Sequence, residues 1–403
     1  MGPKAVCLII SCTLLAWYMH TTFSANFEQP WKLMLMDSSL KILQHMASLL
    51  EKLGLMSFWD FLHILMRWQI VEPISDENVT VTDAIVKDVL VRYYVSKKKS
   101  HELKRAIIYF HGGGASFGTI ALPHYDVFAR LAANTLDAVV VGSDYRKIPK
   151  YHHPTQWSDA YDFLKSFLQP ETLAKYGVDP TRVCILGDSS GAAVAAAMTQ
   201  QVMGDPEIPI KPKAQALIYP VLQMLDTDMP SYRENEYGIM LPKSLLIKMM
   251  SEYLGIDESL EQAMKSNQHI PAEYSHLLKF VNWSTLLPER FKKGHVYTER
   301  IYGSSEIVKK FPGIVDPRAN PLLANDSTLS LQPLTYILTC QYDILRDDGL
   351  IYVSRLRNNG VQVFHEHIEE GFHGSLMCIH KPFDLDLGWR LVGKIISWIN
   401  ENL

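Results

Sequence analysis

The stretch RVCILGDSSG at residues 182–191 determines the fold that we expect for this chain. An apolar, strand-like run leads into the pattern G-x-S-x-G, and an alanine-rich stretch typical of a helix follows it through Val202. A sharp strand-to-helix turn of this kind holds its serine in a strained backbone conformation, and small neighbouring residues let the turn close. The pattern therefore predicts that the Ser189 hydroxyl stands at the carboxyl edge of a sheet, in front of a helix N-terminus. The alternative is a tight Gly-Ser turn without a chemical role.

Further apolar runs without polar alternation predict more strands that are covered on both faces. They lie at 106–110, 138–142, 216–219 and 335–339, and two shorter strands are expected between 78 and 95. Helical stretches intervene at 155–168, 192–202 and 347–358, and Gly360 is placed to end the last of them. Strands that alternate with helices predict a mostly parallel central sheet with helices on both faces, as in the α/β-hydrolase fold.

The expected organisation has four parts. A hydrophobic signal anchor at 1–24 comes first, and N-terminal cap helices and the first strands follow at 25–100. The catalytic core occupies 101–220 and 331–403. A helical cap is inserted into the core at 221–330. Leu40, Leu43, Ala47 and Leu50 recur at helical spacing near the start of the second part. We expect this face to pack on its own domain, with a second membrane contact as the alternative.

A serine hydroxyl needs a base to become a nucleophile, and the order along the chain in this fold is serine, acid, histidine. His373 lies between two glycines in a loop after a last expected strand at 361–367, which follows the one at 335–339. Asp343 comes just beyond the strand before it, on the same edge of the sheet as Ser189. Asp347 and Asp348 are the alternatives for the acid, but their position one turn later better suits the N-terminus of the next helix. We therefore expect Ser189, His373 and Asp343 to form a triad.

A glycine run follows the strand at 106–110 and is the candidate oxyanion hole. It consists of His111, Gly112, Gly113 and Gly114. Glycines let the backbone approach a bound carbonyl closely, and we expect the N–H groups of Gly113, Gly114 and Ser190 to bind the oxyanion. His111 is expected to support the loop without transferring protons.

His365 and His367 lie two residues apart on the last expected strand, on one face, as a pair of metal ligands would. No third ligand is apparent nearby in the sequence, so we treat both as ordinary strand residues. A serine triad needs no metal and no organic cofactor, and we expect neither.

The charge balance gives no indication of a nucleic-acid partner. The chain has 403 residues and a formal net charge of −4, and its longest basic run, at 97–99, lies in a polar stretch typical of a solvated loop. We expect a small-molecule ester or amide as the partner, and nothing in the sequence implies an obligate protein partner.

The N-terminus indicates a membrane. An apolar run from Ala5 to Met19 follows Lys4, its only preceding charge. A spanning helix needs about 17–25 apolar residues and a signal-peptide core about 7–15. Because Thr22 to Ala25 fit a cleavage site poorly, we expect an uncleaved anchor with the N-terminus in the cytosol and the body in the lumen. The alternatives are a cleaved signal peptide with secretion of the protein, and a buried helix of a cytosolic protein.

Three glycosylation sequons agree with a lumenal body: Asn78, Asn282 and Asn325. Cys7 and Cys12 belong to the apolar run, which leaves Cys184, Cys340 and Cys378. An odd number excludes a pure disulfide scaffold, and we expect the cysteines in strand-like runs to be reduced and buried.

Five motifs together resemble the hormone-sensitive-lipase branch of the α/β hydrolases, the "GDXG" lipolytic enzymes, and within it the arylacetamide deacetylase group. They are HGGG at 111–114, DYR at 144–146, GDSSG at 187–191, Asp343 with LRDD at 345–348, and GFHG at 371–374. The similarity covers essentially the whole length, including SDENVT at 75–80 and FVNWS at 280–284. The resemblance implies an endoplasmic-reticulum membrane enzyme, single-pass type II, that hydrolyses short acyl esters and aryl acetamides, with neutral lipid esters as a further class.

Several positions depart from the family pattern. The family continues its motif as GDSAGGN, whereas this chain has Ala192 where the helix packs close to the sheet, and KIP at 147–149 replaces LAP. Ala115 and Ser116 stand where close relatives carry an aromatic residue and a cysteine. The resemblance thus implies that Cys340 lacks its partner and that Ala115 widens the acyl side of the pocket.

The leading hypothesis is a lumenal, membrane-anchored carboxylesterase or deacetylase. It would acylate Ser189 and hydrolyse the acyl-enzyme with water activated by His373. An amidase or a neutral-lipid lipase would use the same triad, because pocket shape sets the leaving group. A third hypothesis is a non-catalytic small-molecule binding protein of the same fold. Such proteins usually lack the catalytic base, and His373 is present here.

Overall fold

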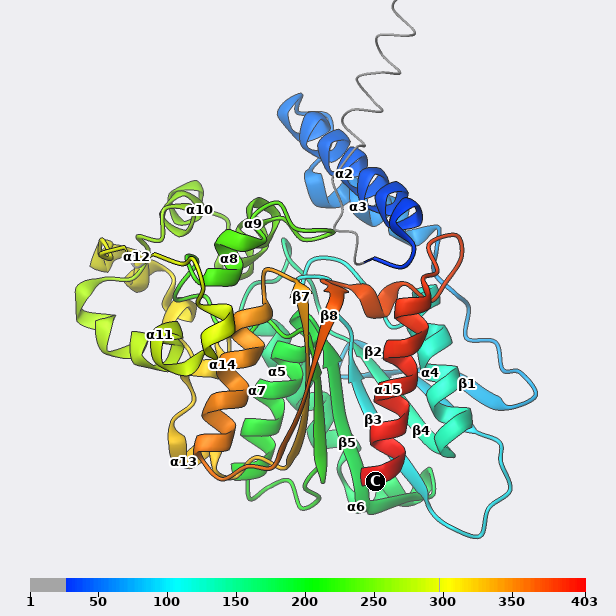
Figure 1. Cartoon of the computed structure of the whole chain (residues 1–403). Coiled ribbons are helices and arrows are strands. Elements are labelled where there is room, and N and C mark those ends of the chain that lie inside the picture. The colour runs from blue at the N-terminus through cyan, green and yellow to red at the C-terminus, as the bar shows by residue number, and fades with distance from the viewer. Residues whose placement is uncertain (1–26, 297) are drawn as a thin grey trace, which may run out of the picture.

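The computed structural model describes residues 27–296 and 298–403, and Figure 1 shows them as one sheet with helices on both faces. Its strands are β1 (Val79–Val86), β2 (Val89–Ser96), β3 (Lys104–Phe110), β4 (Ala138–Asp144), β5 (Val178–Asp188), β6 (Ala214–Ile218), β7 (Leu334–Tyr342) and β8 (Val363–Phe372). They lie in the order β1-β2-β4-β3-β5-β6-β7-β8. Strand β2 is antiparallel to both neighbours, and β4, β3, β5, β6, β7 and β8 pair in parallel. The predicted mostly parallel sheet is confirmed.

Alternate residues of the central strands enter two separate hydrophobic layers. Ile108 belongs to the layer under α5 (Thr155–Phe167), α7 (Ser190–Gly204) and α14 (Arg346–Asn358). Ile107 and Tyr109, its neighbours on β3, belong to the other layer, under α4 (Pro123–Leu136) and α15 (Asp386–Asn402). Figure 1 shows the same division, with α4 and α15 on one side of the sheet and α7 and α14 on the other. Burial on both faces explains why these strands read as continuous apolar runs.

The interval between β6 and β7 is helical, and within the described residues its only β-pairing is an isolated bridge between Pro271 and Gly303. It contains α8 (Pro230–Glu234), α9 (Lys243–Leu254), α10 (Glu258–Lys265), α11 (Trp283–Leu286), α12 (Ser305–Lys310) and α13 (Asp326–Leu329). Short 3-10 helices lie at Ala272–Val281, Glu289–Phe291, Pro312–Val315 and Pro321–Leu323. The interval contains residues 221–330, for which the sequence predicts an inserted cap, and that division into parts stays a prediction.

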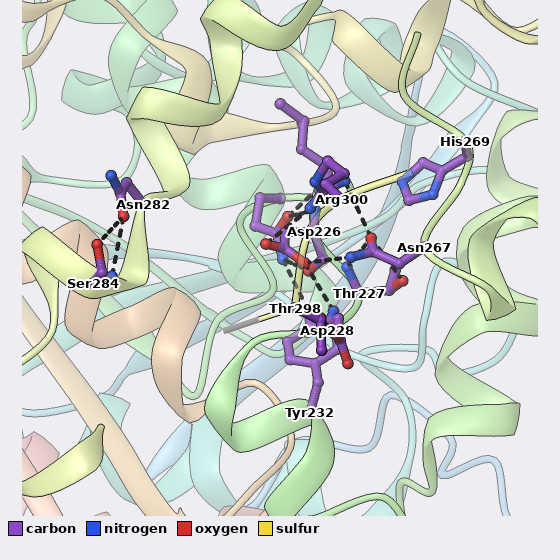
Figure 2. A network of polar contacts seen from close by, with 12 residues as sticks. Asp226, Thr227, Asp228, Tyr232, Asn267, His269, Asn282, Ser284, Thr298 and Arg300 are labelled. Carbon is purple, nitrogen blue, oxygen red and sulfur yellow. Dashed lines mark hydrogen bonds and ion pairs between the residues drawn. The ribbon is translucent and has the colours of Figure 1, made fainter. Parts of the chain in front are cut away.

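A network of polar contacts joins separate segments of this helical interval, and Figure 2 shows it. Asp226 Oδ1 accepts a hydrogen bond from Asn267 Nδ2 at 2.9 Å, and Asp226 Oδ2 pairs with Arg300 at 2.9 Å. Thr227 donates to the carbonyl oxygen of Met264 at 2.6 Å. Because the charges in this network pair with one another, we assign it a structural role.

The chain before β1 forms two helices, α2 (Pro30–Lys52) and α3 (Phe58–Arg67). Ala47 is fully buried, and Leu40 and Leu43 line the main cavity of the molecule. None of the helices in the described residues is long and apolar enough to span a membrane. The signal anchor expected at 1–24 lies outside the described residues. The short helix α6 (Pro170–Lys175) and a 3-10 helix at Ser375–Met377 complete the fold.

Candidate active site

The turn between β5 and α7 carries Ser189 in a left-handed backbone conformation, with φ +54° and ψ −122°. The Ser189 N–H donates to the carbonyl oxygen of Ile218 at 2.9 Å, which fixes the turn to β6. A Cβ atom at Gly191 would overlap the carbonyl oxygen of Phe110, and one at Gly187 would overlap the backbone of Gly191. Only glycines allow this close packing, so the local sequence determines the strained turn.

The structure brings Ser189, His373 and Asp343 together from three separate loops. Ser189 Oγ lies 2.9 Å from His373 Nε2. His373 Nδ1 lies 3.1 Å and 3.0 Å from the two carboxylate oxygens of Asp343. Asp343 Oδ1 also accepts the N–H of Leu345 at 2.8 Å, and the Asp343 side chain is buried. This is the geometry of a nucleophile, a base and an orienting acid.

The alternative acids, Asp347 and Asp348, lie in the first turn of α14 and do not contact His373 within the described residues. Asp347 Oδ2 accepts the N–H of Ser231 at 2.7 Å, and Asp348 Oδ2 accepts the N–H of Leu222 at 2.8 Å. Burial raises the pKa of Asp347, and it raises the pKa of Asp348 to about 8. Both side chains therefore anchor the helical interval to α14.

The glycine loop after β3 lies beside Ser189. Gly113 and Gly114 adopt positive φ angles of +111° and +63°, and both line the same cavity as Ser189 and Ser190. No acceptor in the described part of the chain takes the N–H of Gly113 or Gly114. These two amides can therefore receive an oxyanion.

The first two residues of the loop are engaged elsewhere. Gly112 donates its N–H to Asp188 Oδ1 at 2.9 Å. His111 Nδ1 lies 2.7 Å from the Gly112 carbonyl oxygen and Nε2 lies 3.0 Å from Asp144 Oδ1, while the ring stacks on Tyr145 at 4.8 Å. This arrangement places His111 in a supporting position, as the sequence suggested, and leaves Gly112 without a free amide for an oxyanion.

Asp188 is a positioning residue that the sequence reasoning missed. Its fully buried carboxylate accepts hydrogen bonds from Gly112 N–H at 2.9 Å, from Tyr109 at 3.1 Å and from Tyr125 at 3.2 Å. Burial raises its pKa. Asp188 thereby connects the nucleophile turn to the glycine loop. The available signal was the acid directly before the nucleophile in GDSSG.

Replacing Asp188 with asparagine is expected to lower kcat by about 10- to 100-fold and the free energy of unfolding by about 1–3 kcal/mol. An asparagine amide would turn an N–H group towards one of the three groups that donate to Asp188. That hydrogen bond would be lost, and the glycine loop would be held less firmly. Ester hydrolysis and urea denaturation measure the two effects. The exposed Asp60→Asn is the control, and an Asp188→Asn variant with unchanged kcat would contradict the positioning role.

Lys147, one of the departures from the family pattern, forms an ion pair beneath this loop. Its Nζ lies 2.7 Å from Asp144 Oδ1, the oxygen that also contacts His111. Burial alone would raise the pKa of Asp144, but the Lys147 charge and the His111 hydrogen bond outweigh it and lower that pKa to about 2. The substitution of lysine for leucine thus adds a charged partner to the support of the oxyanion loop.

The Asp144 carboxylate is expected to stabilise the fold by about 2 kcal/mol at neutral pH. Because its pKa is lower in the folded protein than the usual 3.8, this contribution is fully present above about pH 4 and disappears as the pH falls towards 2. Denaturant unfolding of the wild type and Asp144→Asn from pH 3 to 7 measures it. The difference between the two should shrink below pH 4, and a constant difference would contradict the assignment.

A cavity of about 340 Å³ opens above Ser189 and His373. Its lining is mainly apolar and comes from both helical parts outside the core. From α2 and α3 it includes Leu40, Leu43, Leu62 and Leu65, and from α9 it includes Leu245, Leu246, Met249, Met250 and Tyr253. Ala115 also lines it, at the wall where the family resemblance implies a wider pocket. A mainly apolar cavity with a few polar groups is typical of a small-molecule site.

The remaining predicted features lie away from the cavity. His365 Nε2 and His367 Nδ1 both contact the Thr339 hydroxyl, at 2.8 Å and 2.9 Å, and the described residues contain no cluster of three or more potential metal ligands. Cys184, Cys340 and Cys378 are unpaired and buried, with Cys340 Sγ 3.8 Å from Ser375 Oγ.

The three sequon asparagines, Asn78, Asn282 and Asn325, are all exposed. Asn282 and Asn325 cap short helices; Asn282 accepts the N–H of Ser284 at 3.1 Å (Figure 2). Exposure makes each side chain accessible to a modifying enzyme.

Comparison with known proteins shows the fold and the family of this chain. The sequence model of a family described as "alpha/beta hydrolase fold" matches residues 107–278 and 294–377. Arylacetamide deacetylase of Oryctolagus cuniculus is 51% identical over 402 residues, covering 100% of both chains. Neutral cholesterol ester hydrolase 1 of Pongo abelii is 38% identical over 408 residues, covering 100% of both. A fungal esterase from Rhizomucor miehei superposes with a TM-score of 0.62 at 18% identity, over 85% of this chain and 90% of that one.

Proposed function

This chain belongs to the arylacetamide deacetylase family of α/β hydrolases, and from that premise we propose that it cleaves small acyl esters or amides through a Ser189–His373–Asp343 triad. Its class is that of a carboxylesterase- or deacetylase-type serine hydrolase. The distance of 2.9 Å between Ser189 Oγ and His373 Nε2 carries the proposal, because it allows direct proton transfer from the hydroxyl.

The proposed cycle has two halves. As Ser189 Oγ attacks the substrate carbonyl carbon, His373 takes the hydroxyl proton, and the Asp343 carboxylate stabilises the imidazolium. The amides of Gly113, Gly114 and Ser190 bind the negative oxygen of the tetrahedral intermediate. His373 then gives its proton to the leaving alcohol or amine, which departs and leaves an acyl-serine. Water, deprotonated by His373, attacks this ester, and the acid product leaves with the free serine restored.

The cavity favours small substrates within this reaction class. A volume of about 340 Å³ lies at the lower end of the range for drug-sized ligand sites, which suits a short acyl chain next to an aryl or alkyl group. The relative named for cholesterol esters supports neutral lipid esters as a second candidate class, with the same triad. A series of acyl esters of increasing chain length, compared by kcat/KM, distinguishes the two.

A fluorophosphonate probe tests the nucleophile. We expect the folded chain to be labelled, and expect labelling to vanish in Ser189→Ala and in heat-treated protein, because only an activated serine reacts. The exposed Ser330→Ala is the matched control and should label like the wild type. An intact, folded chain that takes no label would favour the non-catalytic binding protein.

We place the protein in the endoplasmic-reticulum membrane, anchored by residues 1–24, with its catalytic body in the lumen. The exposure of Asn78, Asn282 and Asn325 supports this placement. Glycosidase treatment of protein made in cells should change its gel mobility, and sequencing of the mature N-terminus separates a retained anchor from a cleaved signal peptide. Three unmodified sequons would contradict the lumenal placement.

A further inference from the structure

Helix α2 is apolar on two opposite faces. One face packs inward, where Leu33, Met36 and Ala47 are buried. The other face is exposed and carries Trp31, Leu35, Met46, Leu49 and Leu53, which are between 41% and 61% accessible to solvent. These five residues recur at spacings of a single helix face, and none of them is charged. Charged residues such as Lys32 and Lys41 lie between the two apolar faces, so the outer stripe is a distinct apolar surface left open to solvent.

The exposed stripe continues onto α3 and the segments that flank it. Leu55, Ile64, Trp68 and Ile70 are 68%, 40%, 88% and 44% accessible. Figure 1 shows α2 and α3 packed together at one end of the molecule, beyond the edge of the sheet where β7 and β8 end. We name the stripe on α2 together with these exposed residues of the adjacent helix and its flanks the N-terminal apolar face. Large exposed apolar patches of this kind mark interaction surfaces.

The two helices also wall the catalytic cavity. Leu40, Leu43, Leu62 and Leu65 face the cavity from α2 and α3. A molecule that approaches through the N-terminal apolar face is therefore separated from Ser189 by only this pair of helices. A lipid phase on the outer side of the helices would hold apolar esters at high local concentration beside the cavity.

We propose that the N-terminal apolar face lies on the surface of a lipid bilayer, as a contact separate from residues 1–24. The proposal rests on the membrane placement given above. Only residues 20–29 separate the apolar run that ends at Met19 from the start of α2, so the beginning of this face is held within about 40 Å of any bilayer that the run enters. Trp31 and Trp68 suit the interface, where tryptophan rings are enriched, and the leucines suit the acyl region below it.

A depth measurement on the full-length chain tests the contact. In a background with Cys7→Ser and Cys12→Ser, the remaining cysteines are buried, so a cysteine introduced at the surface can be labelled selectively with an environment-sensitive fluorophore. Leu49→Cys and Trp68→Cys report on the N-terminal apolar face. Leu103→Cys is the matched control, because Leu103 is 55% accessible and precedes the amino end of the central strand β3, whereas α2 and α3 lie beyond the carboxyl ends of the parallel strands. Each protein is reconstituted in phosphatidylcholine vesicles with or without nitroxide-bearing lipid.

We expect lipid nitroxide to quench the labels at 49 and 68 and to leave the label at 103 unaffected, while aqueous iodide quenches only the label at 103. Iodide quenching at all three positions would show that the face is in water and overturn the proposal. Resistance of 49 and 68 to both quenchers would show a protein cover, from residues 1–26 or a second copy, and would also overturn it. Fluorophosphonate labelling of the same samples reports on the catalytic proposal separately.

A kinetic comparison gives a second readout. The double variant Leu49→Glu with Leu53→Glu is expected to hydrolyse a vesicle-borne long-chain ester about tenfold more slowly. The reason is that the protein binds the vesicle less tightly when these leucines no longer enter the apolar phase. Hydrolysis of a water-soluble short ester should stay unchanged, since neither residue lines the cavity. Equal losses on the two substrates, or no loss on either, would contradict the bilayer contact.

Discussion

Replacing His373 with alanine is expected to lower kcat/KM for a short acyl ester by at least about 10⁴-fold. The imidazole is the group within hydrogen-bonding distance of Ser189 Oγ, so its loss leaves the hydroxyl without a proton acceptor. Its hydrogen bonds run to Ser189 and Asp343 only, within the described residues, so the fold should survive. Circular dichroism and initial-rate kinetics measure the two effects.

The chain offers a matched control for this variant. His365 is another strand-associated histidine, and its ring contacts Thr339 away from the cavity. We expect His365→Ala to keep kcat/KM within about tenfold of the wild type. Near-normal activity of His373→Ala, with His365→Ala also active, would show that another residue is the base.

Asp343→Asn is expected to lower kcat by about 10⁴-fold at neutral pH. An asparagine has the same shape but no negative charge, so it cannot stabilise the imidazolium. Its amide N–H group can also face His373 Nδ1 and favour the tautomer with the proton on Nε2, which cannot accept the serine proton. Because Asp343 is buried and also accepts the N–H of Leu345, a small decrease in the free energy of unfolding should accompany the loss. Rate measurements across pH and urea unfolding give the two quantities.

The variant Asp347→Asn tests whether Asp343 or Asp347 is the acid of the triad. Asp347 contacts Ser231 and Arg346, and its loss should reduce stability more than the kcat of the folded protein. A large fall in kcat for Asp347→Asn, with little change for Asp343→Asn, would reverse the assignment of the acid.

Much of the core could be predicted because its signals are local. Burial on both faces gives continuous apolar strands, and G-x-S-x-G between a strand and a helix implies the positive φ of Ser189. The pairing of Ser189 with His373, 184 residues apart, was predictable only because parallel strands bring their carboxyl ends to one edge. The chain order serine, acid, histidine then left few candidates.

Other features required the assembled molecule. The role of Asp188 depends on Tyr109, Tyr125 and Gly112, which approach it from elements distant in sequence. The sequence alone marks Lys147 only as a departure from the family pattern. Its ion pair with Asp144 is visible only in the folded chain. Long-range polar contacts of this kind have no periodicity in the sequence, because they depend on how separate elements pack.

The sequence by itself determined the central strands, the helices at 155–168, 192–202 and 347–358 and the candidate residues for acyl transfer, since each follows from burial period, turn chemistry or chain order. Helices α4 and α15, on the other face of the sheet, came only with the structure. The tertiary structure decided which apolar face of α2 is covered and which is left open. Periodicity marks the apolar positions on a helix, but neighbours from the rest of the chain determine which of those positions they shield from water.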